Sequence, residues 1–261
     1  MPDTAIESAG IPPWEKMTVT FDAGPAPVAK IGLVCLDCDQ VIESELRAFL
    51  PISGLSLLST RIPLGGRGTP ETLAAMEAHI PEVAKLILPD DDLDVFVFGC
   101  TSGSMTIGPE RVEAAVHKAR PGVPVTNPVS AATAALRHFG AKRIALLTPY
   151  SDEINAVVGR FIADQGFEIA ARGSFKCDNG VEIGLVPPGA IYEAGVRMGR
   201  TDCDALFISC AGLRASSVVQ RIEDEIGKPV VTSNQALAWD CLRLAEIAAP
   251  VPGFGRLLAE R

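Results

Sequence analysis

Two stretches of the chain, Asp94-Val-Phe-Val-Phe-Gly-Cys100 and Asp204-Ala-Leu-Phe-Ile-Ser-Cys210, follow the same pattern 110 residues apart. Each begins with an acidic residue, continues through four apolar residues and ends in a cysteine. A short, continuous apolar run of this kind is typical of a strand that is buried on both faces of a parallel sheet. We therefore expect two equivalent strands, each with a cysteine just beyond its carboxyl end.

Segments on either side of these stretches also match in pairs. Ile31-Gly-Leu-Val34 resembles Ile144-Ala-Leu-Leu147 at an offset of 113 residues, and Pro124-Val-Thr126 resembles Val230-Val-Thr232 at an offset of 106 residues. Three matched segments in the same order at nearly constant spacing favour a duplicated α/β unit over a chance likeness.

Short apolar runs alternate with longer stretches of helical period from Lys30 onward, which is typical of helices packed on a mostly parallel sheet. We predict an α/β fold of two pseudo-symmetric, doubly wound lobes, each with a four-stranded, mostly parallel sheet flanked by helices. The first lobe should span 29–128 and be completed by a C-terminal helix over 235–261, and the second should span 129–234. A proline-rich arm should precede them over 1–28. Strands are expected at 31–36, 55–63, 94–99, 123–126, 143–148, 167–173, 204–209 and 229–232, and helices at 40–50, 70–88, 109–119, 128–139, 151–165, 187–199, 214–226 and 235–247.

The balance of charges limits the classes of partner. The 261-residue chain has 23 Lys and Arg against 32 Asp and Glu, a net charge of −9, and its basic residues are not clustered. We therefore expect no nucleic-acid partner. No apolar run approaches the roughly 20 residues that span a bilayer, so no membrane partner is expected either. The N-terminus lacks the basic and apolar segments of a signal peptide, which predicts a cytoplasmic location.

Seven cysteines and three histidines set the expectation for thiol and metal chemistry. An odd number of scattered cysteines in a cytoplasmic chain does not indicate a disulfide framework, and three histidines leave little for a metal site. The sequence has no motif for a nicotinamide, flavin, pyridoxal phosphate or nucleotide. We expect no cofactor and no metal, and a cysteine with a special role is expected to be reactive rather than structural.

The residues after the two strand-end cysteines predict an anion site. Cys100 is followed by Thr101-Ser102-Gly103-Ser104, whose backbone N–H groups can bind a negative charge, and Cys210 is followed by Ala211-Gly212-Leu213-Arg214, expected to lead into a helix. Ligands of parallel sheets bind beyond the carboxyl ends of the strands, so both cysteines should face one cleft between the lobes. Donors there would bind a substrate carboxylate and lower the thiol pKa from its free value of about 8.5. Arg214 could pair with that carboxylate or lie in the first turn of the helix.

Two thiols on opposite sides of one carbon suit a particular reaction. One thiol removes a proton α to a carboxylate while the other returns a proton to the opposite face, which inverts the stereocentre. The same pair could instead add to a double bond, allow rotation and then eliminate, which is cis–trans isomerisation. Both routes make Cys100 and Cys210 the catalytic candidates.

The motifs Gly99-Cys-Thr-Ser-Gly103 and Ser209-Cys-Ala-Gly-Leu-Arg214 resemble the two cysteine motifs of the Asp/Glu racemase superfamily, in its maleate isomerase and arylmalonate decarboxylase branch. This branch includes proteins associated with ectoine utilisation. The resemblance covers roughly residues 30 to 245. It implies a cofactor-independent enzyme, a small carboxylate substrate between two lobes, and a homo-oligomer, as a dimer or tetramer. It also implies that Tyr150 and Asn179 contact the substrate. The two anion-site turns add Thr101, Ser102, Ala211 and Gly212 as substrate-binding candidates. Decarboxylases of the branch retain one of the two cysteines, so both together favour an isomerase or racemase.

Asp39 departs from the pattern of the maleate isomerases. They carry an asparagine that binds a substrate carboxylate where this chain reads Leu36-Asp-Cys-Asp39-Gln40. An ionised carboxylate cannot donate a hydrogen bond and would repel a dianion such as maleate. We expect Asp39 to bind a substrate ammonium, which predicts racemisation or epimerisation of a small amino-acid-type carboxylate. The alternative for Asp39 is a helix cap.

Two other functions stay open at the level of sequence. Maleate-type cis–trans isomerisation would use the same two cysteines. A two-lobed α/β chain with a cleft also resembles small-molecule binding proteins, so a non-catalytic metabolite sensor is the third hypothesis. A sensor has no need of paired thiols, which argues against it.

Overall fold

Two four-stranded sheets, built in the same order, form the centre of the molecule. The computed structural model describes residues 12–260, so residues 1–11 of the predicted arm and Arg261 lie outside the described residues. The strand orders are β2-β1-β3-β4 and β6-β5-β7-β8, and every pairing is parallel. The predicted α/β architecture with two equivalent sheets is confirmed. The strands are β1 (Ala29–Leu36), β2 (Leu55–Ile62), β3 (Val95–Phe98), β4 (Val125–Thr126), β5 (Arg143–Thr148), β6 (Glu168–Ser174), β7 (Ala205–Ile208) and β8 (Val230–Thr232).

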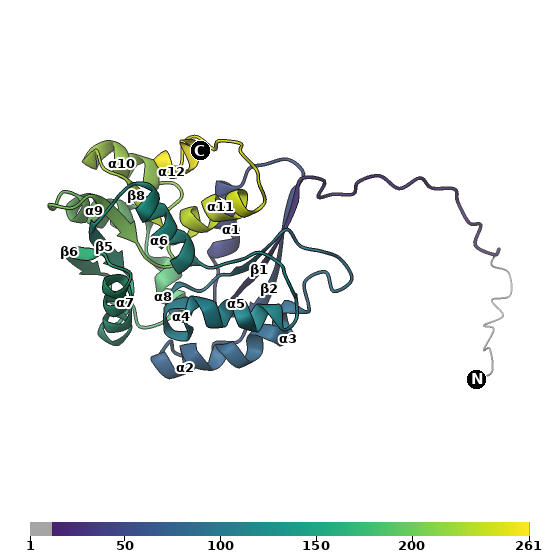
Figure 1. Cartoon of the computed structure of the whole chain (residues 1–261), viewed down its shortest axis with the longest axis horizontal. Coiled ribbons are helices and arrows are strands. Elements are labelled where there is room, and N and C mark those ends of the chain that lie inside the picture. Colours follow the sequence, from purple (N-terminus) through teal and green to yellow (C-terminus); the bar gives the residue numbers. More distant parts are fainter. Residues whose placement is uncertain (1–11, 261) are drawn as a thin grey trace.

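Helices flank both sheets, and Figure 1 shows the two sheets on opposite sides of the molecule with α8 and α11 between them. The helix α11 follows β8 in the chain but packs against α1 and α6, so it ties the end of the second sheet to the first. The helices are α1 (Ile42–Phe49), α2 (Pro70–Ala75), η1 (Met76–His79, a 3₁₀ turn), α3 (Ile80–Ala84), α4 (Thr101–Ile107), α5 (Pro109–His117), α6 (Pro128–His138), α7 (Asp152–Asp164), α8 (Gly180–Leu185), α9 (Pro188–Gly199), α10 (Val219–Ile226), α11 (Ser233–Leu244) and α12 (Arg256–Ala259).

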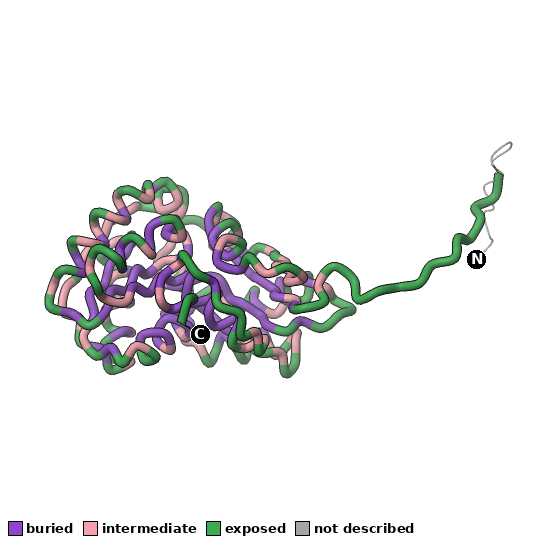
Figure 2. Tube along the Cα trace, turned by 90° about the horizontal axis from the view of Figure 1, so that it is seen from above, coloured by how far each residue is buried: buried purple, intermediate pink, exposed green. Residues whose placement is uncertain are grey.

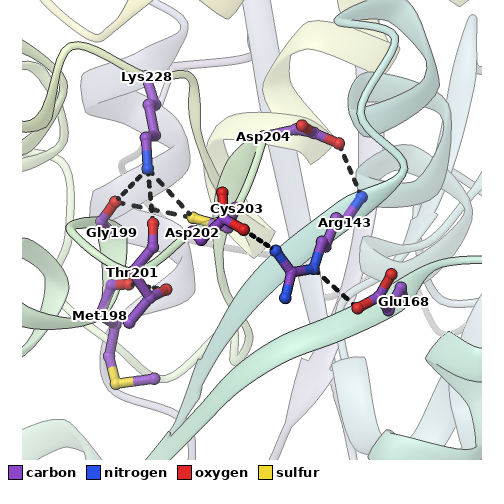
Figure 3. A network of polar contacts seen from close by, with 9 residues as sticks. All are labelled: Arg143, Glu168, Met198, Gly199, Thr201, Asp202, Cys203, Asp204 and Lys228. Carbon is purple, nitrogen blue, oxygen red and sulfur yellow. Dashed lines mark hydrogen bonds and ion pairs between the residues drawn. The ribbon is translucent and has the colours of Figure 1, made fainter.

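The acidic residue that opens each repeated stretch has the same structural role in both sheets. The Asp94 carboxylate accepts the backbone N–H of Lys30 at 2.7 Å, and its own N–H donates to the Lys30 carbonyl at 3.0 Å. Asp204 accepts the backbone N–H of Arg143 at 2.8 Å and donates to its carbonyl at 2.6 Å (Figure 3). Each aspartate therefore fixes the start of a cysteine-bearing strand beside its central neighbour, which explains why the repeat begins with an acid.

Helix boundaries were less predictable than strands. The single helix predicted over 70–88 is wrong: the segment divides into α2, η1 and α3, and Pro81 lies in the first turn of the last piece. The helix predicted over 214–226 begins only at Val219. The short helices α4 and α8 were not predicted. The C-terminal helix predicted over 235–261 is wrong: α11 ends at Leu244, and α12 is a separate short helix. In α4 the residues Thr101-Ser102-Gly103-Ser104 are poor helix formers, and the cap supplied by Cys100 together with burial favours the helix there.

Within residues 12–260, no helix is both long and apolar enough to cross a membrane. The same residues contain no cluster of three or more His, Cys, Asp or Glu side chains that could hold a metal ion. All seven cysteines are free thiols.

The described part of the N-terminal arm leaves the body of the molecule as an extended, exposed segment (Figure 2). Trp14 is 100% exposed and Phe21 is 87% exposed. Met17, Val19 and Phe21 alternate with two threonines, a period of two that is typical of a strand with one apolar face. An apolar face left in water favours association, so we propose that the arm packs on a second copy of this chain.

Removal of residues 1–28 should convert the predicted dimer or tetramer into a species of lower mass, because the apolar face of the arm is then lost. Light scattering coupled to gel filtration measures the mass, and circular dichroism serves as the control for folding. A full-length chain that is monomeric, or a truncated chain of unchanged subunit number, would rule out this role for the arm.

Candidate active site

One cavity, with an open volume of about 800 Å³, lies where the carboxyl ends of the two sets of strands meet. Turns from both halves of the chain line it, including those that follow β1, β3, β5 and β7. The structure brings all of the predicted site residues to this cavity: Asp39, Cys100, Thr101, Ser102, Tyr150, Asn179, Cys210, Ala211 and Gly212.

Cys100 lies at the junction between β3 and α4. Its thiol accepts the backbone N–H of Gly103 at 3.3 Å and thereby caps α4. A side chain at Gly99 would bring its Cβ within 2.6 Å of Ile42, so only glycine allows this turn to pack so closely against α1. The cysteine is 5% exposed and faces the cavity from the first sheet.

Cys210 takes the corresponding place beyond β7, but the turn after it differs from our expectation. Its thiol accepts the backbone N–H of Gly212 at 3.3 Å, as in the first half. The chain then continues in turns, and α10 starts only at Val219, so no helix N-terminus follows directly. The Arg214 guanidinium donates to the Val186 carbonyl at 3.1 Å, and the residue neither lines the cavity nor lies in a helix, so neither of its two alternative roles is observed.

The expected lowering of the thiol pKa values is wrong. Burial raises the pKa of Cys100 to about 11 and that of Cys210 to about 12. The N–H donors of Gly103 and Gly212 lower these pKa values, as predicted, but burial outweighs them, and the negative charge of Asp39 raises both further. Both thiols are therefore protonated at neutral pH.

Asp39 both caps a helix and lines the cavity. One carboxylate oxygen accepts the backbone N–H groups of Val41 and Ile42 at 2.7 and 2.9 Å, at the start of α1. The Arg61 guanidinium donates to the Asp39 carbonyl at 2.6 Å and holds the turn. Burial raises the pKa of the Asp39 carboxyl, while the two backbone N–H groups lower it. The capping alternative is thus observed, and it leaves the second oxygen of the carboxylate available to the cavity.

Tyr150 is buried above Cys210 at the end of β5. The Asn155 amide and the Ser174 hydroxyl donate to its backbone carbonyl at 2.8 and 2.7 Å, which fixes the residue. Burial and the neighbouring Cys210 raise the pKa of the phenol well above its usual value. The Tyr150 hydroxyl is therefore protonated; it is buried beside the Cys210 thiol, whose pKa it lowers, and among the described residues it has no hydrogen-bond partner of good geometry.

Other predicted residues are partly engaged by the protein itself. The side chain of Asn179 caps α8 through the Glu182 N–H at 3.0 Å, and its amide donates to the Glu182 carboxylate at 3.1 Å. The Ser102 hydroxyl lies 3.8 Å from the Cys100 sulfur. Thr101 directs its hydroxyl away from the thiol to Ser233, at 3.1 Å. These three residues would therefore contact a ligand mainly through van der Waals surface. Thr101 and Ser102 can also donate the backbone N–H groups of the first turn of α4.

Sequence reasoning missed an ion pair at the mouth of the cavity. Arg67 and Asp178 come from different halves of the chain, both line the cavity, and their charged atoms lie 3.4 Å apart. Within the described chain, Asp39, Arg67 and Asp178 are the charged residues of the lining. The only signal in the sequence was the glycine-rich stretch Gly65-Gly-Arg67-Gly68, which does not indicate where in the fold the loop lies. In the structure Gly65 and Gly66 have φ of 76° and 117°.

Comparison with known proteins places the chain in a family. The family model described as arylmalonate decarboxylase matches residues 73–258. The chain belongs to the arylmalonate decarboxylase family. The maleate isomerase of Nocardia farcinica is 32% identical over 244 residues, which cover 89% of this chain and 96% of that protein. The arylmalonate decarboxylase of Bordetella bronchiseptica is 32% identical over 142 residues, which cover 53% of this chain and 59% of that protein.

Solved structures of this family agree with the fold. A mutant of the Nocardia farcinica maleate cis–trans isomerase, which carries a covalently bound succinylcysteine intermediate, has a TM-score of 0.80 at 29% identity. The match covers 89% of this chain and 99% of that one. The expected branch of the superfamily, and an enzyme of that branch, are confirmed.

Asp39→Asn should lower the pKa of both Cys100 and Cys210, because the negative charge that raises them is removed. The amide oxygen can still accept from Val41 and Ile42, so the cap is kept. We expect alkylation by iodoacetamide between about pH 7 and pH 10 to become roughly three- to tenfold faster at each cysteine, as measured by peptide mass spectrometry.

Asp178→Asn is the matched control, since Asp178 lines the same cavity but is not a leading influence on either thiol. Its alkylation rates should stay close to those of the unmodified sequence. Equal rates in the two variants would show that the charge of Asp39 does not act on the thiols.

Proposed function

We propose that this protein is a cofactor-independent isomerase that racemises or epimerises a small amino-acid-type carboxylate, with Cys100 and Cys210 as the opposed acid and base. The two cysteines follow equivalent strands of a duplicated fold and line one cavity. Each is adjacent to a turn with backbone N–H donors. This arrangement supports proton transfer on two faces of one bound carbon.

The charge of the cavity is the observation that carries the choice of substrate. A thiol with a pKa of about 11, as at Cys100, is ionised in about one of 10,000 molecules at pH 7. No cation is among the leading causes of either thiol shift, and Asp39 adds negative charge. A substrate ammonium would favour the thiolate that acts as base, whereas a dianion would raise the thiol pKa values further.

The proposed reaction balances without a further reactant. The thiolate of one cysteine takes the α-proton, so the C–H bond breaks, an S–H bond forms and the electron pair is delocalised into the substrate carboxyl group. The thiol of the other cysteine then gives its proton to the opposite face and becomes the thiolate. The product is the mirror-image centre, and the protein is left with the two thiols exchanged in protonation state.

The groups around the thiols support a binding mode for such a substrate. Backbone N–H groups at Thr101, Ser102 and the Ala211–Gly212 turn would hold the carboxylate, and the Tyr150 hydroxyl would donate to it. These contacts stabilise the negative charge that develops on the carboxyl group as the α-proton leaves. Asp39 would bind the ammonium through its second oxygen.

Maleate-type cis–trans isomerisation is the second candidate, favoured by the likeness to the Nocardia farcinica maleate isomerase. Burial raises the pKa of Asp39, and a protonated Asp39 could donate to a carboxylate as an asparagine does. In this reaction a thiolate adds to the double bond, the resulting single bond rotates, and elimination restores the thiolate.

Single enantiomers of a panel of amino acids in deuterated water should gain deuterium at the α-carbon and lose optical rotation. Mass spectrometry and chiral chromatography follow the two changes. Cys100→Ser and Cys210→Ser should each lose racemisation by about 100-fold or more. Each variant should still exchange the α-proton of only one enantiomer, because the remaining thiol reaches one face. Lack of exchange across the panel would refute the proposal, and conversion of maleate to fumarate would then support the second candidate.

Asp39→Asn provides an independent test of the substrate class. Loss of the carboxylate should weaken binding of the amino-acid substrate by roughly 10- to 100-fold, seen as a higher KM, because the partner of the ammonium is removed. The same variant should gain maleate isomerisation relative to the unmodified sequence. An unchanged KM for the amino acid would show that its ammonium does not bind Asp39.

A further inference from the structure

Ser233, the first residue of α11, connects the two cysteine turns through one atom. Its hydroxyl oxygen accepts the Thr101 hydroxyl at 3.1 Å and the backbone N–H of Cys210 at 3.0 Å. Thr101 directly follows Cys100 in the chain, so this oxygen lies between the turn of the first sheet and the turn of the second. Ser233 is fully buried and does not line the cavity.

The serine is free for this contact because its neighbour caps the helix. The Thr232 side chain accepts the backbone N–H of Gln235 at 3.1 Å, and the Gln235 side chain accepts the Thr232 N–H at 3.1 Å, which completes a capping box. The strand register matches Pro124 with Pro229, an offset of 105 residues and not the 106 predicted from the sequence, so the equivalent cap in the first half is Asn127, whose side chain accepts the N–H groups of Val129 and Ser130. The first residue of the helix is thus Pro128 in one half and, in the other, the serine that contacts both turns.

A second bond from the same helix holds the same turn. The amide of Asn234 donates to the carbonyl of Ala211 at 2.8 Å, and Asn234 is itself buried. The backbone of Cys210 and Ala211 is therefore fastened at two consecutive residues to the start of α11. Because α11 packs on α1 and α6, these two bonds fix the position of Cys210 relative to the part of the structure that holds Cys100.

We propose that Ser233 is a positioning residue that sets the placement of the Cys210 turn relative to Cys100 by holding Thr101 and the Cys210 backbone on one hydroxyl oxygen. The predicted effect on turnover rests on the proposed function. The predicted placement of the two thiols does not rest on it, because it can be measured without substrate. Misplacement of a reacting group by about 1 Å can reduce catalysis by about two orders of magnitude, so a single fixed oxygen at this point has a large effect on rate.

Ser233→Ala tests the proposal by removing only the shared acceptor. The readout is the ratio of the Cys210 to the Cys100 alkylation rate with iodoacetamide, measured by peptide mass spectrometry without substrate. We expect this ratio to change by more than twofold, because the backbone of Cys210 loses a bond and that of Cys100 does not. With a substrate that is turned over, kcat should fall about tenfold while KM stays within about twofold, since Ser233 does not contact the cavity.

Asn127→Ala is the control, because it removes a buried helix cap of the other half that contacts neither cysteine turn. It should lower the melting temperature and leave the alkylation ratio unchanged. If Ser233→Ala does not fold, Thr101→Val breaks the contact from the first turn at nearly constant volume while the Cys210 N–H keeps its acceptor. The ratio should again change by more than twofold, in either direction, because the two turns are no longer joined.

A ratio within twofold of the unmodified sequence in the folded variants would overturn the proposal. So would an equal shift in Asn127→Ala, which would indicate general loosening. Failure of the proposed function gives a different result: no amino acid is turned over by any form of the protein, while the alkylation ratio still responds to Ser233→Ala.

Discussion

The chemistry of this site is constrained by the free energy of forming a thiolate in a buried cavity that already contains a carboxylate. Cys100 and Cys210 each have a backbone N–H donor, yet burial and Asp39 leave both pKa values far above neutrality. Backbone donors therefore do not activate these thiols by themselves. In the proposed reaction the remaining stabilisation comes from the substrate, whose ammonium next to Asp39 would favour the thiolate.

The high pKa of the two thiols also links substrate binding to activation of the catalytic base in the proposed reaction. Thiols that are protonated at neutral pH are protected from oxidation and from stray alkylation, since the thiolate is the reactive form. Binding of a substrate with a positive group would raise the thiolate fraction only when the reacting carbon is in place. In the proposed reaction, binding of the substrate ammonium at Asp39 would therefore also activate the base. Side reactions of the sulfur would be limited, because the thiolate forms only when substrate is bound.

The strands and the cysteines could be read from the sequence because they depend on local pattern. The repeat of Asp94 to Cys100 in Asp204 to Cys210 specified two equivalent buried strands, and the parallel topology brought their ends to one cavity. The thiol pKa values could not be read in this way. They depend on how deeply the turns are buried when both halves pack together, and Tyr150, which covers Cys210, comes from a different strand. The ion pair of Arg67 with Asp178 joins residues 111 positions apart, for which the sequence carries no local signal.

Duplication also explains why the two halves had to diverge. A symmetric pair of turns would place each cysteine by the contacts of its own half, and the distance between the sulfurs would then depend on how the two halves happen to pack. The structure instead fastens the second turn to α11, a helix that belongs to the second half by sequence and to the first by packing. Asn127 and Thr232 are equivalent helix caps, but the residue that follows is Pro128 in the first half and, in the second, Ser233, which contacts Thr101 and the Cys210 backbone. In the proposed role, the asymmetry at Ser233 thus joins the two lobes at the cysteine turns and fixes the spacing between the two thiols.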